Sequence, residues 1–171
     1  MSLIDSNYFI GAISLPTDNV HYTNKLQIYI DRTEKEYLVN LMGYELYKLY
    51  IAAPTIGRFE PITNGTDFSN TVTGLEDNWQ GLVNEETYIS MLAYFTYFEY
   101  LRGNQSSETG NGVTYNLFEN SEKISAIHKQ QNAFNLAVEQ YVKLRDYLTT
   151  NSSTFPEWHY VGIEKLSIMG I

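Results

Sequence analysis

The residues Thr87–Arg102, TYISMLAYFTYFEYLR, constrain the fold of this chain more than any other stretch. No formal charge occurs between Thr87 and Phe98, and apolar or aromatic side chains would cover every side of a helix formed here. A helix that is apolar all round is a buried helix. The stretch is too short and too rich in Tyr to span a bilayer, which takes about 20 mostly apolar residues. It therefore predicts the central helix of an α-helical core.

The residues on either side indicate where this helix begins and ends. Asn84 is placed to cap it, and Glu85 and Glu86 would lie in its first turn, where the helix dipole favours carboxylates. Gly103 is a residue type that commonly follows the last turn of a helix. We therefore expect a helix that starts shortly after Asn84 and ends at Gly103.

Composition limits the classes of protein to which the chain can belong. Its 171 residues suit one domain, and a hydrophobic content of 43% is enough for a substantial core. The net charge is −9 with only 11 basic residues, which disfavours binding to nucleic acid through phosphates. The chain has no cysteine, which excludes disulfides, thiolate catalysis and cysteine-bound zinc. The first residues lack the features of a signal peptide, so nothing indicates export.

Two further helices are predicted before residue 55. Asn24 and Gln27 have the spacing of a capping box, and an apolar face with steps of three and four residues follows them. Gly43 breaks this helix. A short helix is expected over Tyr44–Ile51, and Pro54 ends it.

A third long helix is predicted from a cap at Ser121 to about Thr149. Its apolar residues form a single stripe, as in a bundle helix, because four of them recur every seven residues: Ile127, Phe134, Tyr141 and Leu148.

Residues 55–83 lack the helical pattern of the preceding segments and contain many turn-forming residues. Asn64-Gly65 is a strong hairpin turn signal, and Arg58–Ile62 and Thr71–Gly74 are candidate strands. A second glycine-rich stretch covers 103–112, and Gly112–Tyr115 is a candidate edge strand. Both regions are expected to make contacts rather than to form the core.

These elements predict a mainly α protein, a helical bundle of three long helices plus a short one, with a small β-hairpin insertion and extended termini. Residues 1–158 are expected to form one domain. An N-terminal arm over 1–22 docks on the core of this domain, and the hairpin insertion spans 55–83. Residues 159–171 are expected to form an extended C-terminal tail.

The tail is too apolar for a solvated chain end, while its glycines and β-branched residues disfavour a helix. It can extend to a neighbouring subunit, where the edge of the hairpin insertion at 58–74 or, as a second candidate, Val113–Tyr115 would receive it, or fold back on its own core. We predict the first arrangement, so Arg58, Phe59 and five tail residues are candidate subunit-interface residues: Val161, Ile163, Leu166, Ile168 and Met169.

No set of residues indicates catalysis. A Gly-x-Ser-x-Gly motif is absent, and none of the three histidines has a partner at the spacing of a metal site on a helix. Glu99 and Arg102 have the spacing of an ion pair, which at a helix end fixes packing or an interface more often than it catalyses a reaction. The sequence therefore predicts a protein that is not an enzyme and has no cofactor, with Glu99 and Arg102 as interface candidates.

The order of several motifs resembles one known family. Leu26–Tyr50, Asn78-Trp79-Gln80-Gly81-Leu82 and Tyr94–Arg102 are similar to segments of head-to-tail connector (adaptor) proteins of tailed bacteriophages. Shorter matches continue this order at Arg58-Phe59, Asn64-Gly65-Thr66, Gly112-Val113, Glu119-Asn120-Ser121, Lys129 and Ala133-Phe134-Asn135. The closest group occurs in prophages of gut Bacteroidetes and in crAss-like phages. The resemblance covers about 26–158 and leaves the arm and the tail outside.

The resemblance implies a structural protein of the virion neck that acts without catalytic residues. Copies would form a ring between the portal protein and tail or neck proteins, with assembly in the host cytoplasm. DNA would pass through the channel without specific binding, and an acidic wall that repels phosphates suits this passage. No membrane is involved. Whether the isolated subunit is a monomer stays open.

A second hypothesis comes from the aromatic content, which includes 15 Tyr. The chain can instead be a small-molecule-binding or regulatory helical-bundle protein of a bacterium, with the aromatic helix lining a ligand pocket. Concentration-dependent assembly without ligand favours the ring, and ligand-specific stabilisation of a monomer favours the pocket.

Overall fold

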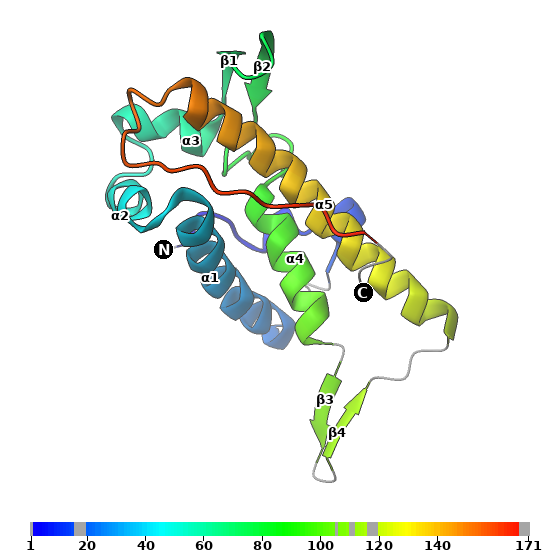
Figure 1. Cartoon of the computed structure of the whole chain (residues 1–171). Coiled ribbons are helices and arrows are strands. Elements are labelled where there is room, and N and C mark those ends of the chain that lie inside the picture. Colours follow the sequence, from blue (N-terminus) through cyan, green and yellow to red (C-terminus); the bar gives the residue numbers. More distant parts are fainter. Residues whose placement is uncertain (1, 16–19, 105, 110–111, 116–119, 168–171) are drawn as a thin grey trace.

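The computed structural model describes residues 2–15, 20–104, 106–109, 112–115 and 120–167, and the described chain is mainly helical with small antiparallel sheets (Figure 1). No described helix is long and apolar enough to cross a membrane. The helices are α1 Val20–Met42, α2 Tyr44–Ala52, α3 Glu60–Asn64, α4 Met91–Gly103 and α5 Asn120–Thr150, with short 3₁₀ turns at Ser6–Tyr8, Gly11–Ile13 and Gly57–Phe59. The strands are β1 Thr66–Asn70, β2 Leu75–Trp79, β3 Ser106–Thr109 and β4 Gly112–Tyr115.

Helix α4 is the centre of the fold, as the apolar stretch predicts. It packs on α1 and on α5, and most of its residues are buried, with Tyr94, Phe98 and Leu101 half-buried on one side. Aromatic rings make both contacts: Tyr37 of α1 stacks on Phe95 at 3.9 Å between centroids, and Phe134 of α5 meets the same ring edge-on at 5.6 Å. The three long helices therefore share one core.

The predicted start of α4 is wrong. The Asn84 side chain accepts hydrogen bonds from the backbone N–H groups of Glu86 and Thr87, but these close a turn that no helix continues. Tyr88 then adopts φ 54°, a left-handed conformation that interrupts a helix. The helix begins only at Met91, where the Ser90 hydroxyl caps it by accepting from the Leu92 N–H. The predicted end at Gly103 is confirmed.

The described part of the N-terminal arm, residues 2–15, lies on the core with Tyr8 and Phe9 buried, and the predicted bounds 1–22 run too far because α1 begins at Val20. The carboxylate of Glu34 in α1 accepts from the Leu3 and Ile4 N–H groups at 2.9 Å each, and burial raises the pKa of this carboxyl. The predicted capping box is wrong because α1 starts at Val20. The Gln27 side chain instead donates to the Ser2 hydroxyl, which ties the arm to α1.

Helix α1 ends at Met42 and α2 follows directly after Gly43, as predicted. Gly43 separates them with φ 79°, a conformation that glycine adopts without a steric penalty. Helix α2 ends at Ala52, before Pro54.

The insertion at 55–83 contains a hairpin, but not where the sequence signals place it. Arg58–Ile62 lies in a 3₁₀ turn and helix α3, and Asn64-Gly65 ends that helix instead of turning a hairpin. Thr71–Gly74 is the hairpin turn between β1 and β2, which pair from Thr66 opposite Trp79 to Asn70 opposite Leu75. The mistake has a physical cause: glycine at positive φ serves equally in a hairpin turn and after the last turn of a helix.

Close backbone packing fixes the base of this hairpin. Gly65 and Gly81 have φ 89° and 90°, and a Cβ on Gly65 would lie 2.5 Å from the Trp79 carbonyl oxygen. The Trp79 indole N–H donates to the Ile62 carbonyl at 3.0 Å, and Trp79 and Leu82 are fully buried. The insertion is therefore continuous with the core at its base.

The last long helix, α5, extends one residue beyond the predicted stretch at each end. Strand β4 confirms the predicted edge strand at Gly112–Tyr115. Its partner β3 is a strand that the sequence pattern did not predict. Along α5 the predicted stripe faces the core: Tyr141 and Leu148 are buried, and Ile127 and Phe134 are half-buried.

Candidate protein-interaction site

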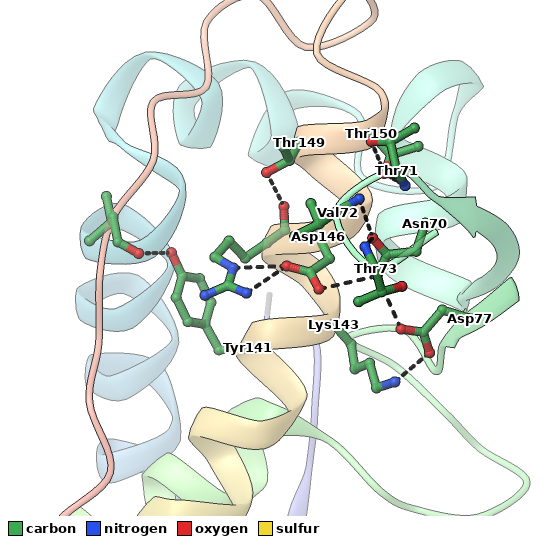
Figure 2. A network of polar contacts seen from close by, with 12 residues as sticks. Asn70, Thr71, Val72, Thr73, Asp77, Tyr141, Lys143, Asp146, Thr149 and Thr150 are labelled. Atoms are coloured by element: carbon green, nitrogen blue, oxygen red, sulfur yellow. Dashed lines mark hydrogen bonds and ion pairs between the residues drawn. The ribbon is translucent and has the colours of Figure 1, made fainter. Parts of the chain in front are cut away.

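The β1–β2 hairpin lies against the last turns of α5, and Asn70 is the centre of that contact (Figure 2). Its side-chain amide donates to Asp146 Oδ2 at 3.1 Å and to Asp77 Oδ2 at 3.2 Å. Its side-chain oxygen accepts from the Val72 and Thr73 N–H groups at 2.9 and 3.2 Å. One buried amide thus joins the helix, both strands and the turn.

Charged groups complete this junction. The carboxylate of Asp146 is buried, with 3% of the residue exposed, and the Arg145 guanidinium donates to its Oδ1 from Nε and Nη2 at 2.9 and 2.7 Å. Lys143 pairs with Asp77, and its hydrogen bond lowers the pKa of that carboxyl. A buried carboxylate with these partners is costly to disrupt, so the network fixes the hairpin on α5.

The turn of the hairpin is held close to the end of α5 but stays exposed itself. The Thr71 N–H donates to the Thr150 hydroxyl at 3.1 Å. Beyond this contact, Val72 is 55% and Leu75 70% exposed. We call Thr71–Glu76 the tip.

The outward face of the hairpin is acidic. Asp67 and Glu76 are exposed there, each hydrogen-bonded to its cross-strand neighbour, Asn78 and Ser69 respectively. The chain carries no Lys, Arg or His between Arg58 and Arg102, but it carries seven carboxylates: Glu60, Asp67, Glu76, Asp77, Glu85, Glu86 and Glu99.

The described part of the tail lies along α5 of its own chain, the second of the two arrangements considered for it (Figure 1, red). Asn135 accepts from the Leu166 N–H at 2.8 Å and donates to the Leu166 carbonyl at 3.1 Å. The Tyr141 hydroxyl donates to the Val161 carbonyl at 2.6 Å, and burial raises the Tyr141 pKa to about 12. Ile163 packs on the core. Ile168 and Met169 lie outside the described residues.

Arg58 and Phe59 do not form a free edge either. The Arg58 guanidinium pairs with Glu157 at 3.0 Å and donates to the Thr154 carbonyl at 2.6 Å, and its hydrogen bond lowers the Glu157 pKa. Phe59 is buried and meets Tyr50 edge-on at 5.8 Å. These two candidates therefore join the insertion to the segment after α5 within one subunit.

Glu99 and Arg102 form the predicted ion pair, 3.6 Å apart. The Tyr37 hydroxyl also donates to Glu99, at 3.1 Å, and burial with the nearby Glu99 charge raises the Tyr37 pKa. The Glu99 side chain is mostly covered, whereas that of Arg102 is 67% exposed. Of this pair only Arg102 is available to a partner. The predicted interface residues that the structure describes do not come together in one patch.

A cavity of about 440 Å³ opens between the arm, α1 and α2. None of its lining residues belongs to α4, so it is not the aromatic pocket of the ligand-binding hypothesis. Its lining combines the apolar Leu38, Tyr47 and Ile51 with the charged Asp31, Glu34 and Lys35. Among the described residues, no group of three or more His, Asp or Glu side chains is placed to hold a metal ion.

The residues that fix the hairpin were missed by sequence analysis. Asn70 and Asp146 are 76 positions apart, and no local pattern joins them. One signal was available: Asp146 lies between Leu144 and Leu148 near the apolar stripe of α5, where a charge needs a partner.

A family model described as a family of unknown function, DUF6712, matches residues 38–163. This match spans α2 to α5, both hairpins and the described tail up to Ile163. No curated protein and no solved structure matches the chain. The chain therefore belongs to the DUF6712 family.

Proposed function

We propose that this protein is a structural subunit of a bacteriophage virion neck. Copies form a ring between the portal protein and the tail or neck proteins, and the ring continues the DNA channel. The subunit works by shape and contact, without catalysis or a cofactor. This role follows the resemblance of its ordered motifs to head-to-tail connector proteins.

The observation that carries the proposal is the fixed, projecting hairpin. A ring subunit must present the same contact surface in every copy, so that contact has to be held rigidly on its core. The Asn70–Asp146 hydrogen bond and the Lys143–Asp77 ion pair hold the β1–β2 hairpin in this way. Its exposed Leu75 serves no packing purpose within the subunit.

The motifs of the resemblance also coincide with the contacts between elements. Trp79 in the second motif donates to Ile62 in the insertion, and Phe95 in the third packs between Tyr37 and Phe134. The finer architecture is part of the same proposal: α1, α4 and α5 are the three long helices of a bundle, and α2 is the short one.

The charge distribution agrees with a channel protein. A net charge of −9 repels the phosphates of passing DNA, which then slides without being bound. Seven of the 20 acidic residues lie between Arg58 and Arg102 with no basic residue among them, so the hairpin and the residues around it would contribute to this field.

The test is deletion of the gene from a phage or prophage that encodes this protein. We expect DNA-filled heads and free tails that do not join, and immunogold label at the head–tail junction of the parental virions. A complementing gene for the intact protein is the control. Joined, infectious virions without the protein would contradict the proposal.

A further inference from the structure

The face of α5 that carries the C-terminal tail holds the main chain of an extended peptide. The Asn135 side chain makes two hydrogen bonds to Leu166: its oxygen accepts from the N–H at 2.8 Å, and its amide donates to the carbonyl at 3.1 Å. Gln131 donates to the same carbonyl at 2.8 Å, and the Tyr141 hydroxyl donates to the Val161 carbonyl at 2.6 Å. All of these contacts go to backbone atoms, which a peptide of almost any sequence supplies.

The same face of α5 carries an apolar side chain that needs a cover. Val138 lies three residues after Asn135 and three before Tyr141, on the side of the helix that holds the tail. It is only 3% exposed, although it lies outside the main hydrophobic core. Beside it, Glu139 pairs with Lys165 of the tail at 2.6 Å. We call this set of residues the α5 strip: Gln131, Asn135, Val138, Glu139 and Tyr141.

The tail occupies the α5 strip without becoming part of the core. In its described part, 159–167, three apolar residues are half-buried and the others are exposed. It runs along α5 as an extended segment with no helix or strand (Figure 1, red). The last buried core residue in the described chain is Phe155, which precedes the tail. The tail can therefore leave the strip while the core stays closed.

We infer that the α5 strip is a binding site for an extended segment of a partner protein, and that the tail occupies the strip until this partner arrives. The partner segment presents a free backbone N–H and carbonyl to Asn135, as Leu166 does in the structure. It carries apolar side chains at the places where the tail has Val161, Ile163 and Leu166, because this is the pattern that the strip already accommodates.

The tail then acts as an internal competitor. Because it is tethered to the same chain, its effective concentration is high enough to exclude loose peptides. A segment that an assembly holds close to the strip has a similar advantage and can replace it. The inference rests on the proposed function, which supplies neck proteins as such neighbours.

The first test measures binding of a labelled synthetic peptide with the sequence of residues 159–171 to the full chain by fluorescence anisotropy. Leu166→Pro removes the N–H that Asn135 accepts and should detach the tail, so this variant is expected to bind the peptide about tenfold or more tightly than the parent. Leu166→Ala keeps the N–H and is the matched control, with a smaller gain. Ile163→Asp detaches the tail by a different change and should give a gain like that of Leu166→Pro.

Two further changes show whether the backbone contacts are responsible. Asn135→Ala, added to Leu166→Pro, should remove most of the gained affinity, whereas Asn132→Ala, an exposed asparagine outside the strip, should not. A peptide methylated on the Leu166 nitrogen keeps its side chain but loses the N–H, and should bind more weakly. The inference fails if both detached-tail variants bind the peptide no better than the parent, or if the two asparagine changes have equal effects.

Photo-crosslinking identifies the occupant in virions. A photoreactive residue in place of Glu139 should reach the tail in the isolated subunit and a different neck protein in virions. A crosslink in virions to the tail of this chain or of a second copy would overturn the assignment to a partner protein. Peptide binding in a protein that is absent from virions would leave the site standing and remove the neck function. A neck protein whose detached-tail variants bind no peptide would do the reverse.

Discussion

The C-terminal tail and the β1–β2 hairpin were both expected to make contacts with partners, but the structure places them differently. The tail is the more apolar and lacks a secondary-structure pattern, which made it the candidate for contact with a neighbour. In the structure its described part lies on α5, with Leu166 held by Asn135 and Val161 by Tyr141. The hairpin is more polar, yet it projects with Leu75 exposed.

The difference shows that an apolar, extended segment can find its contacts within its own chain. An extended segment can satisfy its backbone on side chains of a helix, as Asn135 does with both polar groups of Leu166. A hairpin with a polar junction can hold a few apolar side chains away from the core. The predictions below test each half of this comparison.

The largest effect is expected at the hairpin junction. Asp146→Ala removes a buried carboxylate and leaves Asn70 and Arg145 without their partner, which should lower the free energy of unfolding by about 3 kcal/mol. Urea unfolding measures this loss. Asp146→Asn keeps an acceptor of the same shape and is the control, with a smaller expected loss. An equal, negligible effect of both changes would show that the junction does not hold the hairpin.

Truncation after Trp158 tests the tail. Removal of the contacts with Gln131, Asn135 and Tyr141 should cost about 2 kcal/mol, or about 4–8 °C in melting temperature, while association persists. Lys165→Ala is the control, because its ion pair with Glu139 is half exposed on both sides. An unchanged melting temperature with lost association would return the tail to its role as a subunit interface.

The hydroxyl group of Tyr141 joins the tail to α5 through one hydrogen bond. Tyr141→Phe deletes the hydroxyl that donates to the Val161 carbonyl and should cost about 1 kcal/mol. Limited proteolysis should then cut more rapidly after Tyr160, which is exposed beside this contact. Tyr44→Phe, in an exposed position of α2, is the matched control. Equal cleavage rates in both variants would argue against this anchor.

The smallest effect is a pH dependence at the hairpin. The Asp77 pKa is lowered by its hydrogen bond with Lys143, so the carboxylate stabilises the folded state above its usual pKa of about 3.9. This contribution is lost as the pH falls through the lowered pKa. Asp77→Asn should therefore melt below the parent at pH 7 and approach it near pH 3. A melting difference that does not change with pH would exclude this linkage.

Local patterns predicted the parts of the fold that depend on local chemistry. The uncharged run gave the buried centre of α4, and Gly43 gave the boundary between α1 and α2. Starts of helices were less predictable, because Asn84 closes a turn with the same hydrogen bonds that it would make as a cap. The hairpin was displaced because a glycine after Asn64 suits a helix end equally well.

The candidate site was the least predictable part. Its junction depends on Asn70 and Asp146, which only the packing of the hairpin on α5 brings together. The tail's attachment depends on Asn135, which accepts from the Leu166 N–H. In the sequence, Asn135 is one of several polar residues in a helix, and nothing marks it as the partner of the tail. Long-range pairs of this kind leave no periodicity in the sequence.

Thiol labelling compares the two regions directly, because the chain has no cysteine of its own. Single variants Ile163→Cys in the tail and Leu75→Cys at the tip are treated with a thiol reagent in dilute and in concentrated solution. We predict slow labelling at 163 at every concentration, and labelling at 75 that is fast in dilute solution and slows as copies associate. Labelling at 163 that is as fast as at 75 when dilute, and slows only on association, would contradict the account.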